Sequence, residues 1–184
     1  MEAQSRSTLD LLKSGAPDIR IFKAYAADVK AVDGDEGAYR FTITTADVDR
    51  DRDVIDPAGW KIDNFLRAKG PVLWAHDYSQ PPIGRTLDLI RTERGLSATM
   101  RFADAETYPF ADTIHRLVKG GFLSATSVGF APIKWAQNEE RRGIDFFEQE
   151  LLEWSVVPVP ANPHALIEAR AAGVDVEPLR EWAA

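Results

Sequence analysis

A succession of short β-like segments joined by tight, charged turns is the feature that most limits how this chain can fold. The clearest pair is IGRTLDLI at 83–90 and GLSATMRF at 95–102, which flank a turn at 91–95. Apolar and polar residues alternate in both segments, so one face of each can be buried while the other meets water. The pattern predicts a hairpin and favours antiparallel pairing.

Similar signals recur along most of the chain. Runs of β-branched, aromatic or alternating apolar residues predict further strands at 19–32, 39–48, 71–76, 123–135 and 144–161, with Pro158 and Pro160 ending regular pairing in the last. Helical spacing or flanking signals predict helices at 60–68, 107–120 and 163–172. About seven or eight strands with two or three helices predict an α+β, mainly β fold: an antiparallel closed or strongly curled β-barrel with the helices packed outside.

The length of 184 residues suits one domain. Gly15 and Pro17 interrupt the first apolar cluster, so we expect a flexible arm at 1–17, the barrel domain at 18–172 and an acidic tail at 173–184. The first residues lack the apolar core of a secretory signal, and no apolar run approaches the ~20 residues that cross a bilayer.

Charge and composition exclude several function classes. A net charge of −7 suits neither phosphate backbones nor anionic lipids, so we expect no nucleic acid and no membrane as partner. The absence of cysteine excludes disulfides, a cysteine nucleophile and thiolate metal sites. The alternating acids of VDRDRDVID at 48–56 lack EF-hand spacing, which predicts a solvated loop. We expect no metal and no cofactor.

Imidazole chemistry has three candidates in this chain. His76 ends the apolar run PVLWAH, where either a half-buried structural role or a general base is consistent with the residues. Its neighbour Asp77 would point to the opposite face of a strand and is a poor orienting acid. His115 is expected on the solvated side of its helix, and His164 is expected to be structural or exposed.

Two serines in LSATSVGF, at 123–130, raise the question of a nucleophile. The residues alone fit either a strand with small hydroxyls or a strand that carries a reactive serine. The stretch is no G-x-S-x-G elbow, because Ala125 stands at the first glycine position and no helix follows. Ser124 and Ser127 are three apart, so they cannot share a face of a regular strand.

Glu153 stands in LLEWSVV, a strand segment that is apolar on both faces. Strict alternation places Leu151, Glu153, Ser155 and Val157 on one face. A buried carboxylate is costly unless it is paired or hydrogen-bonded. Either Glu153 reaches water at an edge, or it has a cationic partner, for which the candidates are His76, Lys134, Arg141 and Arg142.

Several motifs in order resemble the HK97-like prohead maturation serine proteases of tailed phages, which are related in fold to the herpesvirus assemblins. The resemblance covers roughly residues 20–170 and rests on four stretches: PVLWAHD at 71–77, PPIGR at 81–85, KGGFLSATSVGF at 119–130 and LLEWSVVPVPANPHA at 151–165. It implies that His76 is the general base, Ser127 the nucleophile and Glu153 the third member of a triad. In the assemblins a second histidine stands in that third place. Ser124 is then expected to be structural.

Elementary chemistry is consistent with these roles. A serine hydroxyl is a weak nucleophile until a positioned base takes its proton, and a carboxylate can hold that base in the correct tautomer. One departure concerns the oxyanion, because the assemblin arginines have no counterpart in PVPANPH at 158–164. We therefore expect backbone N–H groups of Val128, Ala161 or Asn162 to stabilise it.

The resemblance also implies partners and a location. It predicts an endopeptidase that cleaves the scaffold polypeptide or the scaffold-like arm of the major capsid protein, and its own termini. It places the protein inside the phage procapsid in the host cytoplasm, or in a bacterium that carries a prophage, and suggests a homodimer. Two other functions stay open on the sequence: a catalytically idle barrel acting as scaffold or assembly chaperone of the procapsid, and a barrel that binds a small ligand.

Overall fold

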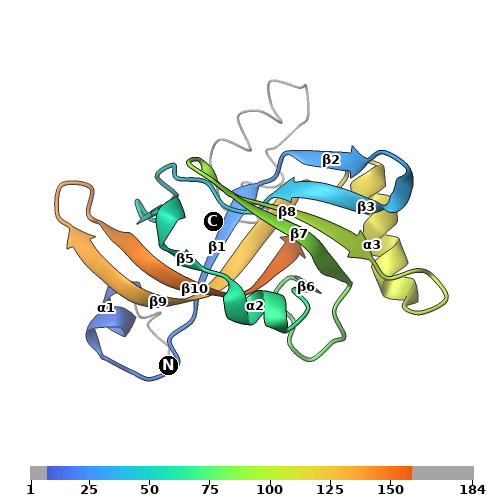
Figure 1. The fold of residues 1–184 in the computed structure, drawn as a ribbon. Helices are drawn as coiled ribbons and strands as arrows, with labels where there is room; N and C mark the ends of the chain where they lie inside the picture. The colour runs from blue at the N-terminus through green and yellow to red at the C-terminus, as the bar shows by residue number, and fades with distance from the viewer. Residues whose placement is uncertain (1–7, 159–184) are drawn as a thin grey trace, which may run out of the picture.

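One large, strongly curled sheet dominates the protein (Figure 1). The computed structural model describes residues 8–158, and the description that follows concerns these residues. The sheet has ten strands. They are β1 (Ile21–Ala26), β2 (Val29–Val32), β3 (Asp35–Thr42), β4 (Val54–Ile55), β5 (Trp60–Lys61), β6 (Pro71–Trp74), β7 (Gly84–Thr92), β8 (Gly95–Phe102), β9 (Ala125–Asn138) and β10 (Gly143–Val157). The helices are α1 (Thr8–Lys13), α2 (Asp63–Arg67) and α3 (Pro109–Lys119), with a short 3-10 turn at Pro57–Gly59.

The strand order is β1-β9-β10-β6-β7-β8-β3-β2, with β4 and β5 also paired to β10. The prediction of a mainly β fold with a strongly curled sheet and two or three helices is confirmed. The expectation of purely antiparallel pairing is wrong, because β4, β5 and β6 all run parallel to β10. The reason is the length of β10, whose 15 residues offer one edge to three short strands in succession.

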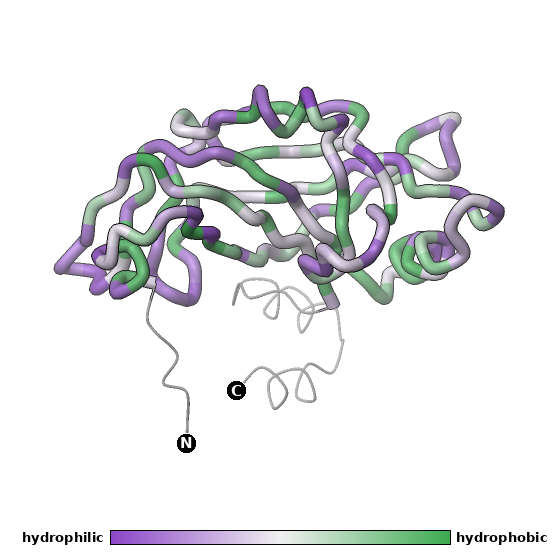
Figure 2. The backbone as a smooth tube through the Cα atoms, turned by 90° about the horizontal axis from the view of Figure 1, so that it is seen from below, coloured by the Kyte–Doolittle hydropathy of each residue, from purple (hydrophilic) through white to green (hydrophobic). Residues whose placement is uncertain are grey.

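The hydrophobic core is formed mainly by apolar residues of the strands, joined by Leu12 of α1, Phe65 of α2 and the buried face of α3. Phe41, Ala98 and Met100 are fully buried, as the patterns of the segments at 39–48 and 95–102 predict. Figure 2 shows that hydrophobic and hydrophilic positions alternate along the chain and that the turns are largely hydrophilic. The buried strand β6 follows the expectation for PVLWAH, since Val72 and Leu73 are both buried although they face opposite sides.

Helix α3 begins with Pro109 and is followed by Gly120, as the sequence predicts. The expectation that His115 faces solvent is wrong. Its ring packs between Tyr39 and Phe102, with centroid distances of 5.4 and 5.2 Å. Because the helix lies beside β8, a position at the edge of its apolar stripe is covered by aromatic side chains of the sheet.

The remaining helices differ from the sequence prediction in extent. The predicted helix at 60–68 contains β5 followed by the shorter α2. Helix α1 lies in the predicted arm, and its Leu12 is buried in the core. The predicted helix at 163–172 and the acidic tail lie outside the described residues, and the predicted domain boundaries stay predictions. Within residues 8–158, no helix is long and apolar enough to cross a membrane.

Candidate active site

A tight turn after β6 presents His76 to the centre of the sheet. Asp77 donates its backbone N–H to the carbonyl of Trp74 at 2.9 Å, so the turn closes over Ala75 and His76. Both of these residues have positive φ, 48° and 59°, which is the pattern of a type I′ turn. Left-handed backbone is uncommon for residues other than glycine, and consecutive examples cluster at functional sites.

Ser127 lies on β9, which is flanked by β1 on one side and β10 on the other. Its hydroxyl oxygen is 2.6 Å from Nε2 of His76, and the residue is 2% exposed. Ser124 precedes the strand, is exposed, and its carbonyl accepts the backbone N–H of Ala27. The structure thus separates the two serines of LSATSVGF and brings only Ser127 to the imidazole.

Glu153 approaches the other side of the same imidazole. Its Oε1 is 2.6 Å from Nδ1 of His76, and the residue is 2% exposed. Of the four partners that the sequence offers for Glu153, His76 is the one in contact. Within the described residues Lys134 pairs with Glu148 and Arg141 with Asp145, while Arg142 occupies a turn with φ of 57°.

A β-bulge in β10 sets the direction of Glu153. Leu151 pairs with Phe130 and Glu153 pairs with Gly129, so Leu152 is the extra residue. The prediction that Leu151 and Glu153 share a face is therefore wrong. The bulge turns Leu151 into the core with Phe130 and releases Glu153 to the opposite face, where Ser127 and His76 meet.

Two neighbours of the site have no counterpart in the sequence prediction. The ring of Phe22, which is partly exposed, packs against that of His76 with a centroid distance of 4.4 Å and an interplanar angle of 49°. Gly129 pairs with Phe22 and Glu153 across the strands and leaves the space that their side chains fill. The signal for Gly129 lay in the motif itself, since glycine inside a strand often marks close approach of another group. Phe22 gave no signal beyond an apolar residue in a strand.

Ser155 is the third neighbour that the sequence prediction left without a role. Its hydroxyl accepts the backbone N–H of His76 at 3.0 Å and donates to Oε2 of Glu153 at 2.9 Å. It is fully buried and pairs directly with Ser127 across β9 and β10.

The other sequence candidates lie away from this chain of contacts or outside the described residues. Asp77 accepts hydrogen bonds from the amide and hydroxyl of Ser79, which lower the pKa of its carboxyl. Val128 pairs with Lys23 on one side and Trp154 on the other, so its N–H lies in the plane of the sheet, and this weighs against its predicted oxyanion role. Ala161, Asn162 and His164 lie outside the described residues.

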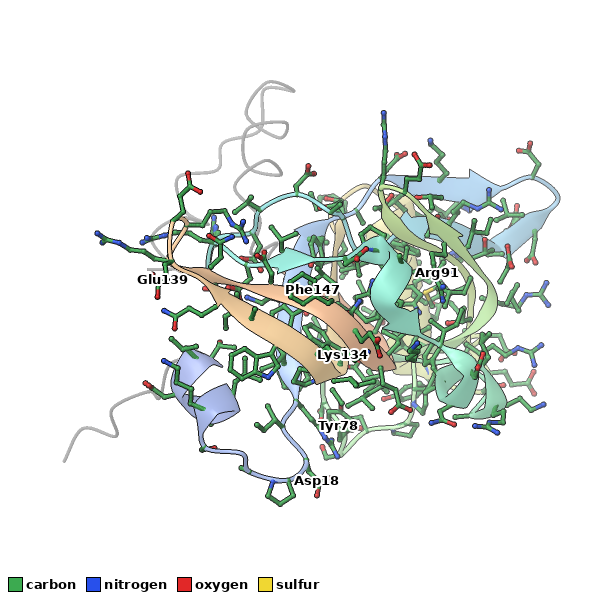
Figure 3. The ribbon with its side chains drawn as sticks, turned by 60° about the vertical axis from the view of Figure 1, so that its left-hand side comes forward. Asp18, Tyr78, Arg91, Lys134, Glu139 and Phe147 are labelled. Atoms are coloured by element: carbon green, nitrogen blue, oxygen red, sulfur yellow. The ribbon has the colours of Figure 1, made fainter. Side chains whose placement is uncertain are left out.

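Tyr78 adds a polar group near the carboxylate. Burial raises the pKa of its hydroxyl and the negative charge of Glu153 raises it further, while Arg20 partly offsets both. The guanidinium of Arg20 lies 5.2 Å from the centre of the Tyr78 ring. Figure 3 shows Tyr78 and Asp18 at the lower edge of the molecule in this view, away from Glu139 at the tip of the β9–β10 turn.

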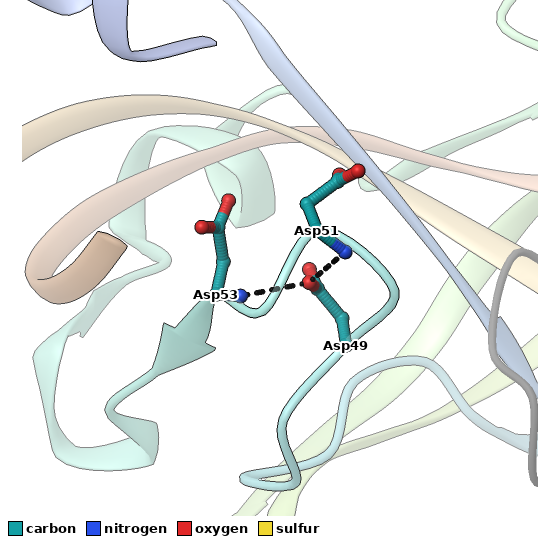
Figure 4. Close-up of side chains that lie close together, drawn as sticks. All are labelled: Asp49, Asp51 and Asp53. Atoms are coloured by element: carbon teal, nitrogen blue, oxygen red, sulfur yellow. Dashed lines mark hydrogen bonds between the residues drawn. The ribbon is translucent and has the colours of Figure 1, made fainter. Parts of the chain in front are cut away.

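A cluster of three aspartates is the part of the described chain that could hold a metal ion. Oxygens of Asp49, Asp51 and Asp53 lie within 4.8 Å of one another, and Asp49 accepts the backbone N–H groups of the other two (Figure 4). However, Nζ of Lys23 lies 2.9, 2.5 and 2.7 Å from the three carboxylates. The cluster therefore has an internal cation.

The same cluster corrects the expectation of a solvated loop. The side chains of Lys23, Asp49 and Asp53 are only 4%, 7% and 3% exposed. Burial lowers the pKa of the Lys23 ammonium, but the three carboxylates raise it by more, so the net pKa is raised. The loop is thus only partly solvated: Lys23, Asp49 and Asp53 form a buried ion-pair cluster between β1 and the approach to β4, while Asp51 is 65% exposed.

Ser127, His76 and Glu153 form one continuous chain of hydrogen bonds. A serine hydroxyl touches one nitrogen of an imidazole, and a buried carboxylate touches the other. This arrangement suits nucleophilic catalysis by serine, since the imidazole can take the hydroxyl proton and the carboxylate can hold the imidazole in place.

Comparison with known proteins places the chain in a family. Residues 13–178 match the model of the caudovirus prohead serine proteases. The chain is 33% identical over 143 residues to the prohead protease of Escherichia phage T5, covering 74% of this chain and 66% of that protein. It is 27% identical over 150 residues to the capsid polyprotein of Pseudomonas phage PAJU2, covering 79% of this chain and 22% of that protein.

A solved structure shares the fold. The capsid assembly protease of bacteriophage T4 superposes with a TM-score of 0.56 over 77% of this chain and 98% of that chain, at 9% identity. At this identity the likeness concerns the fold alone, whereas the family match spans most of the sequence. The chain belongs to the caudovirus prohead serine protease family.

Proposed function

We propose that this protein is a serine endopeptidase that acts through Ser127, His76 and Glu153. The observation that carries the proposal is the pair of 2.6 Å contacts that join the Ser127 hydroxyl to His76 and His76 to Glu153. Membership of a family of serine proteases supports the same conclusion.

In this mechanism Oγ of Ser127 attacks the carbonyl carbon of the scissile peptide while its proton passes to Nε2 of His76. Glu153 accepts Nδ1–H and stabilises the imidazolium that forms. The tetrahedral intermediate collapses as His76 gives its proton to the leaving amine. Water then attacks the acyl-enzyme with His76 again as base, which releases the new carboxyl end and restores the serine.

The oxyanion of the tetrahedral intermediate needs hydrogen-bond donors. Removal of one such donor costs about 10²–10³ in rate in serine proteases. We propose backbone N–H groups of Ala161 or Asn162 for this role ahead of Val128, because the ladder pairs of Val128 compete for its amide.

Capsid-related polypeptides are the proposed substrates. Two relatives are named as a prohead protease and a capsid polyprotein, which supports the scaffold polypeptide or the arm of the major capsid protein as the target, inside the procapsid in the host cell. Cleavage of the protein's own termini and a homodimer belong to the same proposal.

Co-expression with the cognate capsid protein tests the proposal. Wild type is expected to shorten the capsid protein, and Ser127→Ala is expected to leave it intact. Ser124→Ala is the matched control, since it removes an exposed hydroxyl three residues away and is expected to cleave like wild type. Equal processing by wild type and Ser127→Ala would show that another residue is the nucleophile, and no processing by wild type would favour an idle scaffold.

A further inference from the structure

Ser155 joins the backbone of His76 to the carboxylate of Glu153. Its Oγ lies 3.0 Å from the amide nitrogen of His76, 2.9 Å from Oε2 of Glu153 and 3.3 Å from Nδ1 of His76. The residue is 0% exposed, so these protein groups, and not water, determine how its hydroxyl is used.

The direction of each bond follows from the one proton that the hydroxyl carries. Glu153 has acceptor atoms only, so Ser155 donates to Oε2 and accepts the amide N–H of His76 with its lone pair. The carboxylate then has one oxygen fixed by Ser155 and the other free for Nδ1–H of His76. One side chain thereby determines the position of both members of the His76–Glu153 pair.

The turn that carries His76 needs such an anchor. Its two central residues have positive φ, a backbone that is unfavourable for both alanine and histidine. The backbone N–H of His76 donates to the hydroxyl of Ser155, and the backbone N–H of Ala75 donates to the carbonyl of Val156. Strand β10 therefore holds the turn at two successive points.

We infer that Ser155 is a positioning residue of this active site. It binds both the carboxylate of Glu153 and the backbone of His76, and so holds the imidazole of His76 within reach of Ser127. The inference rests on the proposed serine protease function for its kinetic consequence. Its geometric consequence, the state of the His76–Glu153 hydrogen bond, does not depend on cleavage.

Two variants separate hydrogen bonding from packing. Ser155→Ala removes the hydroxyl, and Ser155→Cys keeps a side chain of similar shape with only a weak donor. Thr126→Val is the matched control, because Thr126 is also fully buried, lies next to Ser127, and points its hydroxyl to the carbonyl of Thr42 on the other face of the sheet.

The first measurement is the rate at which a fluorophosphonate probe modifies Ser127. Ser155→Ala and Ser155→Cys are expected to lower the maximal rate about 10²-fold, the loss that follows a small misplacement of a catalytic group, with little change in the probe concentration for half-maximal rate. Thr126→Val is expected to react like wild type. Wild-type rates in both Ser155 variants would overturn the inference.

The second measurement is the proton NMR spectrum of the unmodified protein, in which an Nδ1–H bonded to a buried carboxylate resonates far downfield. We expect this resonance in wild type and Thr126→Val and its loss or marked shift in both Ser155 variants. An unchanged resonance in Ser155→Ala would overturn the inference. Failure of the wild type to react with the probe would instead count against the proposed function.

Discussion

The carboxylate of Glu153 occupies the space in which residue 129 would carry a Cβ atom. A Cβ built on Gly129 falls well inside contact distance of Oε1 of Glu153 and 3.0 Å from the ring of Phe22. The residue that pairs with Glu153 across the sheet therefore has to be glycine for the carboxylate to reach His76.

Gly129→Ala is expected to push Glu153 away from His76 and to lower the rate of Ser127 modification by about 10²-fold or more. The fold should survive, because the first atom that must move is the end of a side chain. Gly37→Ala is the control, since the nearest atoms to a Cβ there are 3.9 Å away. A fully active Gly129→Ala protein would contradict the role given to this contact.

Glu153→Gln tests the carboxylate itself. The amide keeps the size of the side chain but can turn a donor toward Nδ1–H of His76, which favours the wrong tautomer. We expect a drop in rate of about 10³–10⁴, by analogy with the loss of the orienting carboxylate in other triads. Glu139→Gln, at the exposed tip of the β9–β10 turn (Figure 3), is the control and should react normally. Comparable rates for the two variants would exclude an orienting role.

Lys23→Met addresses the buried ion-pair network. It leaves Asp49 and Asp53 without their cation, and breaking a buried pair in this way costs about 3–5 kcal/mol of unfolding free energy. Lys30→Met removes a cation from an exposed pair with Asp28, and there the change should stay below about 1 kcal/mol. Urea unfolding of the two variants measures the difference, and equal stabilities would show that the network contributes little.

Two carboxylates of the β9–β10 hairpin, Asp145 and Glu148, should make the stability of the protein depend on pH. Burial raises the pKa of Asp145, but hydrogen bonds from Asn138 and Arg141 lower it by more, so its net pKa is lowered; that of Glu148 is lowered by Lys134. A lowered pKa means that the stabilisation is present above the unfolded pKa and is lost as pH falls through the folded pKa. Asp145→Asn should therefore lower Tm at about pH 6 and have no effect at about pH 2. A lowering of Tm that persists at about pH 2 would exclude the charge of Asp145 as its cause. Asp33→Asn, which changes an exposed aspartate, is the control.

Local patterns predicted the parts of the fold that depend on local sequence. The 83–102 hairpin, the buried strand of Val72 and Leu73 and helix α3 follow from alternation, apolar runs and helix signals. The parallel pairing of β4, β5 and β6 with β10 joins segments that lie far apart in the chain, and no local period encodes it.

The candidate active site also combines features that follow from local sequence with features that depend on long-range strand pairing. Burial of Glu153 followed from apolar faces, and its need for a partner followed from the cost of an isolated charge. The bulge at Leu152 could not be predicted, because it arises from pairing with β9. Lys23 did leave a signal, since alternation places it between Ile21 and Tyr25 on the buried face, but its aspartate partners come from a distant loop.

The most direct test of the central claim is to identify the residue that a fluorophosphonate probe modifies, by tandem mass spectrometry of the digested protein. We predict a single adduct on Ser127 in wild type and its loss in His76→Ala. An adduct on Ser124 or on another serine, or an adduct on Ser127 that forms equally fast in His76→Ala, would contradict it.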